Sequence, residues 1–153
     1  MNQVKKKCPL ALSVISAVIA FLSIMTYILP VTFARNVFRL LSAEHVMRWV
    51  MLINGEFAHD FFYKVFPIIM YVSVALLAVW AILSLIRLKA AGIIGLIASI
   101  IHCVIGAAWF YYALVYAPEM ASYNMPMTPV PYLMPVIGIA GIVLAILQIK
   151  KSK

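Results

Sequence analysis

Four long runs of apolar residues, separated by polar stretches of unequal length, dominate the sequence. The runs cover residues 9–29, 66–86, 91–116 and 132–149, and none of them contains Asp, Glu, Lys or Arg. A hydrocarbon core about 30 Å thick is crossed by about 20 apolar residues in a helix. The pattern therefore predicts an all-α fold, an integral membrane four-helix bundle that forms a single membrane domain over residues 1–153.

The first run also has to be compared with a cleaved signal peptide, because Lys5–Lys7 resemble the basic start of one. The apolar part of a signal peptide has only about 7–15 residues and ends in a small-x-small cleavage site. This run is longer and ends at Ile28-Leu29-Pro30. We expect it to be a retained membrane span.

The connections between the runs differ in character. Residues 87–89 join the second and third runs so tightly that these two helices are expected to be antiparallel neighbours. Residues 117–131 are rich in proline, which is expected to prevent a continuous helix there.

Residues 31–65 form the longest connection, too polar to span a membrane and too apolar for a free loop. Thr32 can cap a short helix that carries Phe33, Val37, Leu40 and Leu41. A second helix, capped by Ser42 and ended by Asn54-Gly55, carries Val46, Trp49, Val50 and Ile53. Helical spacing resumes over residues 56–66, with Pro67 at a kink or at the start of the second span. We expect short amphipathic helices at the outer interface, against lipid or as a cap on the bundle.

Composition supports a membrane environment. The chain is 67% hydrophobic and 10% charged, with a mean hydropathy of +1.11, whereas a soluble domain has about 25% charged residues. The net charge of +8 does not indicate nucleic acid, because the basic residues form short clusters beside the apolar runs instead of a continuous stripe. The partner that this pattern predicts is the lipid bilayer.

The charges are divided unequally between the two sides of the membrane. One side has eight basic residues and no acid: Lys5, Lys6, Lys7, Arg87, Lys89, Lys150, Lys151 and Lys153. The other side has four basic residues and all four acids: Arg35, Arg39, Arg48, Lys64, Glu44, Glu56, Asp60 and Glu119. Because Lys and Arg accumulate in cytoplasmic loops, we expect a cell-membrane protein with both termini in the cytoplasm.

A candidate ligand or metal site lies on the outer side. Glu56, His59 and Asp60 share one face of a helix, and Glu-x-x-His is a spacing that carboxylate-bridged metal sites use. Those sites need a second such motif, which this chain lacks, so a single metal would have to recruit His45 or Glu119. The alternative is a solvated polar face. Whether any metal binds, and which cofactor if any, is not determined by the sequence.

Arg35 and Arg39 form a second outer feature. They lie four residues apart, where like charges on a helix repel each other. We expect an anion between them, either a lipid phosphate or the carboxylate of a ligand or partner.

His102 is the one strongly polar, potentially ionisable side chain deep within a span. Such groups are costly in lipid and usually face the interior of a bundle. Gly95, Ser99 and Gly106 lie on the same helical face, and small residues allow close helix contact. His102 is therefore either a proton-relay or ligand site, or a neutral imidazole bonded across helices.

No catalytic motif accompanies these residues: the chain has no Gly-rich phosphate loop, no Ser-His-Asp order and no HExxH. The sequence favours a non-catalytic protein, a subunit or accessory protein of a membrane assembly, as a homo-oligomer or within a larger complex. The alternative is a metal- or small-molecule-binding or transport protein with its site at the outer mouth.

Overall fold

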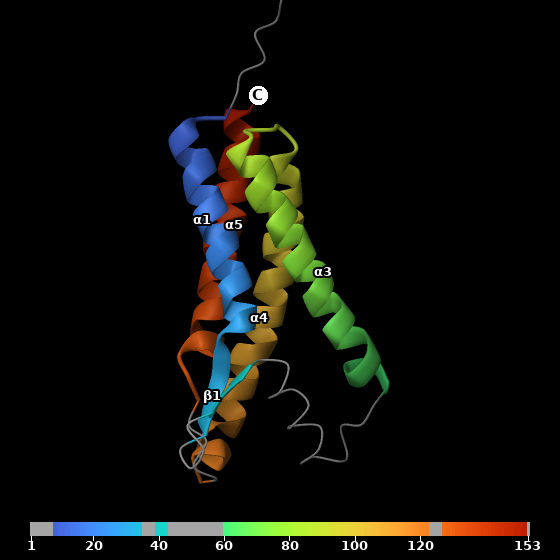
Figure 1. Ribbon diagram of the computed structural model, residues 1–153, viewed down its shortest axis with the longest axis vertical. Coiled ribbons are helices and arrows are strands. Elements are labelled where there is room, and N and C mark those ends of the chain that lie inside the picture. Colours follow the sequence, from blue (N-terminus) through green and yellow to red (C-terminus); the bar gives the residue numbers. More distant parts are fainter. Residues whose placement is uncertain (1–7, 35–38, 43–59, 123–126, 153) are drawn as a thin grey trace, which may run out of the picture.

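Four long helices account for most of the chain. The computed structural model describes residues 8–34, 39–42, 60–122 and 127–152. The long helices are α1 (Leu10–Ile28), α3 (Asp60–Leu85), α4 (Ala91–Ser122) and α5 (Val130–Lys151), shown in Figure 1. Each contains a stretch long and apolar enough to cross a membrane. The expected all-α, four-span architecture is confirmed, and the chain is a multi-pass membrane protein.

Prolines and basic residues mark the ends of α1 and α5. Leu29 is extended, with ψ 145°, as expected for a residue before a proline such as Pro30. Pro129 precedes α5, and the helix has a proline in its first turn, where the missing N–H would have no helical partner. Lys150 and Lys151 lie in the last turn of α5, where cations complement the helix dipole.

The connection between α3 and α4 is a tight turn that places the two helices antiparallel, as expected. Arg87 has φ 59°. Its N–H donates to the carbonyl of Ser84 (3.0 Å), and the N–H of Leu88 donates to the carbonyl of Leu83 (3.0 Å). This pair of hydrogen bonds around a left-handed residue is the Schellman motif, which usually has glycine at that position.

α4 extends further than the sequence indicated. It continues through Pro118 to Ser122, beyond the expected end at residue 116. α3 begins at Asp60 and passes Pro67, in agreement with the helical spacing expected over residues 56–66, so this proline does not start the helix.

The first part of the outer segment was predicted incorrectly. Instead of a short helix after Thr32, the structure has the antiparallel strands β1 (Pro30–Ala34) and β2 (Arg39–Ser42). Thr32 lies opposite Leu41, and Ala34 lies opposite Arg39. Pro30 cannot donate a hydrogen bond, and the Val-Thr-Phe sequence that follows favours extended backbone. The second expected helix lies outside the described residues.

The four helices pack as a square. α1 and α4 each contact α3 and α5, so α1 lies diagonally across from α4, and α3 from α5. α3 diverges from the other three toward its N-terminal end (Figure 1). The tightest pair is α4 with α5.

Glycines allow this close approach. A Cβ atom on Gly138 of α5 would lie 2.8 Å from the Cα of Cys103, and one on Gly106 of α4 would lie 2.7 Å from the nitrogen of Pro135. Real side chains do not fit at such distances, so the two backbones touch through small residues, as is common between membrane helices.

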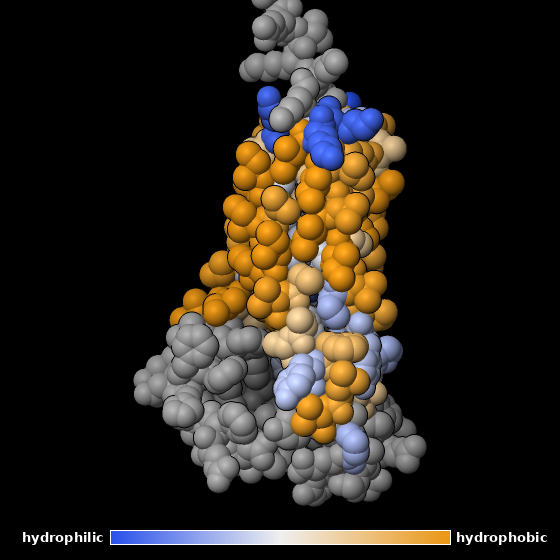
Figure 2. Space-filling model, turned by 180° about the vertical axis from the view of Figure 1, so that it is seen from behind, coloured by the Kyte–Doolittle hydropathy of each residue, from blue (hydrophilic) through white to orange (hydrophobic). Residues whose placement is uncertain are grey.

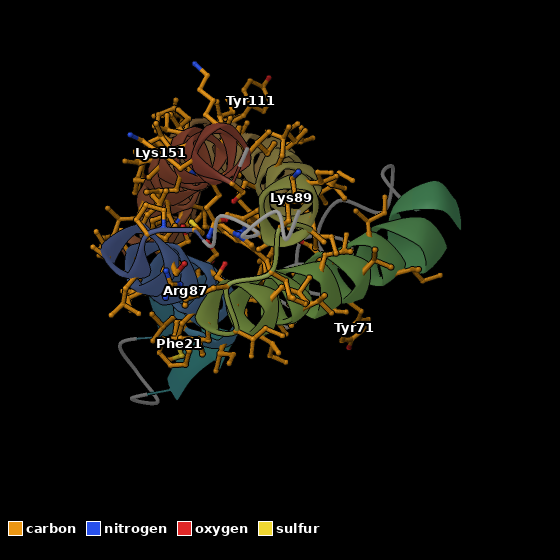
Figure 3. All side chains as sticks on the ribbon, turned by 90° about the horizontal axis from the view of Figure 1, so that it is seen from above. Phe21, Tyr71, Arg87, Lys89, Tyr111 and Lys151 are labelled. Carbon is orange, nitrogen blue, oxygen red and sulfur yellow. The ribbon has the colours of Figure 1, made fainter. Side chains whose placement is uncertain are left out.

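The outward faces of the helices are apolar. Figure 2 shows hydrophobic side chains along the middle of the bundle and the most hydrophilic ones gathered at the end where α5 stops, with mildly hydrophilic ones toward the other end. We call this the basic end; its described cations are Arg87, Lys89, Lys150 and Lys151. Phe21, Tyr71 and Tyr111 point away from the bundle (Figure 3) and are exposed. This is the surface expected of a protein solvated by lipid tails.

Candidate functional site

The interior of the bundle contains many small and polar side chains. α1 turns a single face inward: Ser13, Ser16, Ala17, Ala20, Ser23 and Thr26 are all buried. The hydroxyl of Ser23 donates to the Ile19 carbonyl (2.9 Å), and that of Thr26 donates to the Ser23 carbonyl (2.7 Å). These two hydroxyls are satisfied by the backbone of their own helix, which is a common solution in membrane helices.

A first polar cluster joins three helices in the middle of the bundle. The Tyr27 hydroxyl of α1 lies 2.9 Å from Nδ1 of His102 on α4 and 3.0 Å from the hydroxyl of Ser73 on α3. The Tyr27 and His102 rings meet edge to face, with centroids 5.2 Å apart and an interplanar angle of 67°. His102 and Ser73 are fully buried. The cluster therefore spans the α1–α4 diagonal through the centre of the bundle.

The hydrogen bonds of this cluster can run in either direction. In one arrangement, Ser73 donates to Tyr27 and Tyr27 donates to Nδ1. In the other, the Nδ1 proton is donated to Tyr27 and the tyrosine proton to Ser73. Both arrangements leave every group uncharged, which suits a site whose surrounding spans contain no Asp, Glu, Lys or Arg. The imidazole is thus held across helices by a tyrosine hydroxyl.

A second polar cluster spans the other diagonal, nearer the basic end. The indole N–H of Trp80 on α3 donates to Oε1 of Gln148 on α5 (2.9 Å), and Nε2 of Gln148 donates to the hydroxyl of Ser84 on α3 (3.0 Å). All three side chains are buried. The Trp80 ring lies directly against Gly95 of α4, where any Cβ would overlap it. A large aromatic ring can therefore fill the centre because a glycine faces it.

A third polar contact closes the basic end. Nε and Nη2 of Arg87 both donate to the carbonyl oxygen of Cys8, with a distance of 2.7 Å for Nε. Figure 3, seen from this end, shows the Arg87 side chain between α1 and α3. The turn between α3 and α4 is thereby fastened to the residue that leads into α1.

Sequence reasoning identified His102 but missed the side chains that bond it and those of the second cluster: Tyr27, Ser73, Trp80, Ser84 and Gln148. Tyrosine and tryptophan are counted among the hydrophobic residues of the composition, although each has a polar atom that needs a partner when buried. Gln148 did give a signal, because its amide lies in an otherwise apolar run.

The predicted outer site is only partly within the described residues. Glu56, His59, His45 and Arg35 lie outside them.

Of the remaining predicted residues, Asp60 is the first residue of α3, Glu119 lies three residues before the end of α4, and Arg39 begins β2. All three are at the end of the bundle opposite the basic end (Figure 1). In the part of the chain that the structure describes, no three His, Cys, Asp or Glu side chains are grouped to hold a metal ion.

Comparisons with models of known protein families, with curated protein sequences and with solved structures find no match to this chain.

Proposed function

We propose that this membrane protein is non-catalytic and acts as a subunit or accessory protein of a membrane assembly. The observation that supports this role is the way its buried polar groups are used. Tyr27, Gln148 and their partners bond one helix to another across both diagonals. Such bonds stabilise one arrangement of the bundle, while the outward faces offer an apolar surface to lipid or to partner helices.

The unequal distribution of charge supports an orientation for this role. The basic end has the α3–α4 turn and the end of α5, and its lysines and arginine favour the cytoplasmic face. In this orientation, Asp60, Glu119 and the β1–β2 strands lie on the outer side of the cell membrane.

Photocrosslinking in the native membrane tests the proposal. A photoreactive amino acid is placed at one outward position on each helix: Phe21, Tyr71, Tyr111 and Val136, all exposed. A subunit interface should give a discrete cross-linked product, either a homodimer or a complex with one partner, from one or two of the four faces. Recovery of the monomer alone from all four positions, and after purification in mild detergent, would contradict an assembly role.

A metal- or small-molecule site at the outer mouth is the second candidate. It is supported by the Glu56, His59 and Asp60 spacing and by the position of Glu119 at the same end of the bundle as Asp60. Elemental analysis of the purified protein, with His59→Ala as the matched variant, tests the metal version. Stoichiometric metal that is lost in the variant would support a metal site, and wild-type protein without metal would rule one out.

A further inference from the structure

The second ring nitrogen of His102 is the starting point. Nδ1 is bonded to Tyr27, but Nε2 makes no hydrogen bond to any group among the described residues, although His102 has 0% of its surface exposed. Buried polar atoms in native proteins are nearly always hydrogen-bonded, and ordered water satisfies them where no protein group does. The edge-to-face contact with Tyr27 fixes the ring, so Nε2 cannot turn toward a different partner without breaking the Nδ1 bond.

Ser99 supplies a second polar atom of the same kind. It lies three residues before His102 on α4, on the same face of the helix. Its side chain is 1% exposed, and its hydroxyl has no hydrogen-bond partner in the described part of the structure. A Cβ atom on Gly141 of α5 would lie 2.5 Å from this hydroxyl, so the hydroxyl fits there because the facing residue is glycine.

The chemistry of the missing partner follows from these two atoms. If Tyr27 donates to Nδ1, Nε2 has a proton and needs an acceptor; if Nδ1 donates to Tyr27, Nε2 needs a donor. A partner that can both donate and accept, as water can, satisfies either arrangement. The partner must be uncharged, because the apolar spans around it contain no charged side chain to compensate an ion.

We propose that Nε2 of His102 and the hydroxyl of Ser99 bind an ordered water molecule at the centre of the bundle. This water extends the Tyr27 cluster into one chain, from Ser99 through water, His102 and Tyr27 to Ser73. Every member can both donate and accept, so the chain is uncharged in either direction of its hydrogen bonds. The chain links α4, α1 and α3 inside the bundle.

Radiolytic hydroxyl-radical footprinting of the full chain in lipid nanodiscs tests the proposal, because radicals formed from a bound water oxidise the side chains beside it. We expect the His102 ring, although fully buried, to be oxidised several-fold faster than Trp80. Trp80 is equally buried, is intrinsically more reactive, and has its N–H bonded to Gln148. Equal protection of the two residues, or equal labelling of both, would overturn the proposal.

Two serine variants make the test specific. Ser99→Ala removes one of the two ligands and should reduce the oxidation of His102 several-fold. Ser84→Ala removes a buried hydroxyl that bonds Gln148 instead and should leave the oxidation of His102 unchanged. If Ser99→Ala leaves His102 oxidation at the wild-type rate, Ser99 does not bind the water and the proposed site is wrong.

Discussion

Tyr27 and Gln148 each form two hydrogen bonds to side chains of other helices. Hydrogen bonds between membrane helices contribute about 0.6 kcal/mol on average and up to about 1.7 kcal/mol. Removing a side chain that serves two partners leaves both of them buried without a bond, and each such loss costs about 1–3 kcal/mol. These two residues should therefore be more sensitive to substitution than their apolar neighbours.

Gln148→Leu keeps the size of the side chain but removes its hydrogen bonds to Trp80 and Ser84. We expect a loss of about 1–2 kcal/mol in the free energy of unfolding, measured by reversible unfolding in mixed SDS micelles. Ser84→Ala should have a smaller effect because the bond from Trp80 to Gln148 survives. Leu147→Ala, next in sequence but partly exposed to lipid, is the matched control and should lose less than Gln148→Leu. Equal losses in Gln148→Leu and Leu147→Ala would show that the amide contributes nothing.

Tyr27→Phe tests the first cluster in the same way. The ring remains, but the hydroxyl that joins His102 to Ser73 is gone, and we expect destabilisation by about 1–2 kcal/mol. Ser73→Ala should be milder, since the contact between Tyr27 and His102 persists. Denaturant titration of the three proteins gives the order wild type, Ser73→Ala, Tyr27→Phe; the reverse order of the two variants would rule out a bridging role for Tyr27.

The sequence alone identified His102 as a polar residue within a span, but not the side chains that form hydrogen bonds with it. His102 stands out because imidazole is costly in lipid. Its bond to Tyr27 joins residues 75 positions apart in the chain, a proximity that depends on how four helices pack and that no local pattern contains.

Among the structural elements, the α4–α5 pair depends on glycine for its close contact. Gly138→Ala places a methyl group against the backbone of Cys103, so α4 and α5 must separate. We expect destabilisation by about 1–3 kcal/mol, as for other overpacked interiors. Ala107→Val adds bulk to an exposed position on α4 and should be nearly neutral. Thermal unfolding measures both variants. An unchanged melting temperature for Gly138→Ala would mean that the two helices are not in backbone contact.

Arg87, in the turn between α3 and α4, affects stability in two opposite ways. Its left-handed backbone favours glycine by about 1 kcal/mol over other residues, while its guanidinium holds the Cys8 carbonyl. Arg87→Ala loses the bond and keeps the strain, whereas Arg87→Gly loses the bond and relieves the strain. Thermal unfolding should therefore rank Arg87→Gly as the more stable of the two variants, and the opposite ranking would refute the strained turn.

The four long helices could be predicted from the sequence, because an uncharged apolar run of about 20 residues is typical of a membrane-spanning helix. The β1–β2 strands could not, since Phe33, Val37 and Leu40 fit a helical spacing as well as a strand. In the structure Leu29 is extended and Pro30 begins β1. The proline-rich segment does separate two helices, since α4 ends at Ser122 and α5 begins at Val130, but Pro118 itself lies inside α4.

For the molecule as a whole, the central claim is a four-span bundle with both ends on the cytoplasmic side. The apolar outer faces and the basic end (Figure 2) are compatible with this arrangement. The outer site and the partner surface that we propose both depend on it.

The most direct measurement is a set of paired reporter fusions, one active only in the cytoplasm and one only outside it, joined after Asn54, Lys89 and Lys153. We expect fusions after Lys89 and Lys153 to report the cytoplasm and those after Asn54 to report the outside. The reverse pattern would contradict the orientation, and Lys89 and Lys153 reporting opposite sides would contradict the four spans themselves.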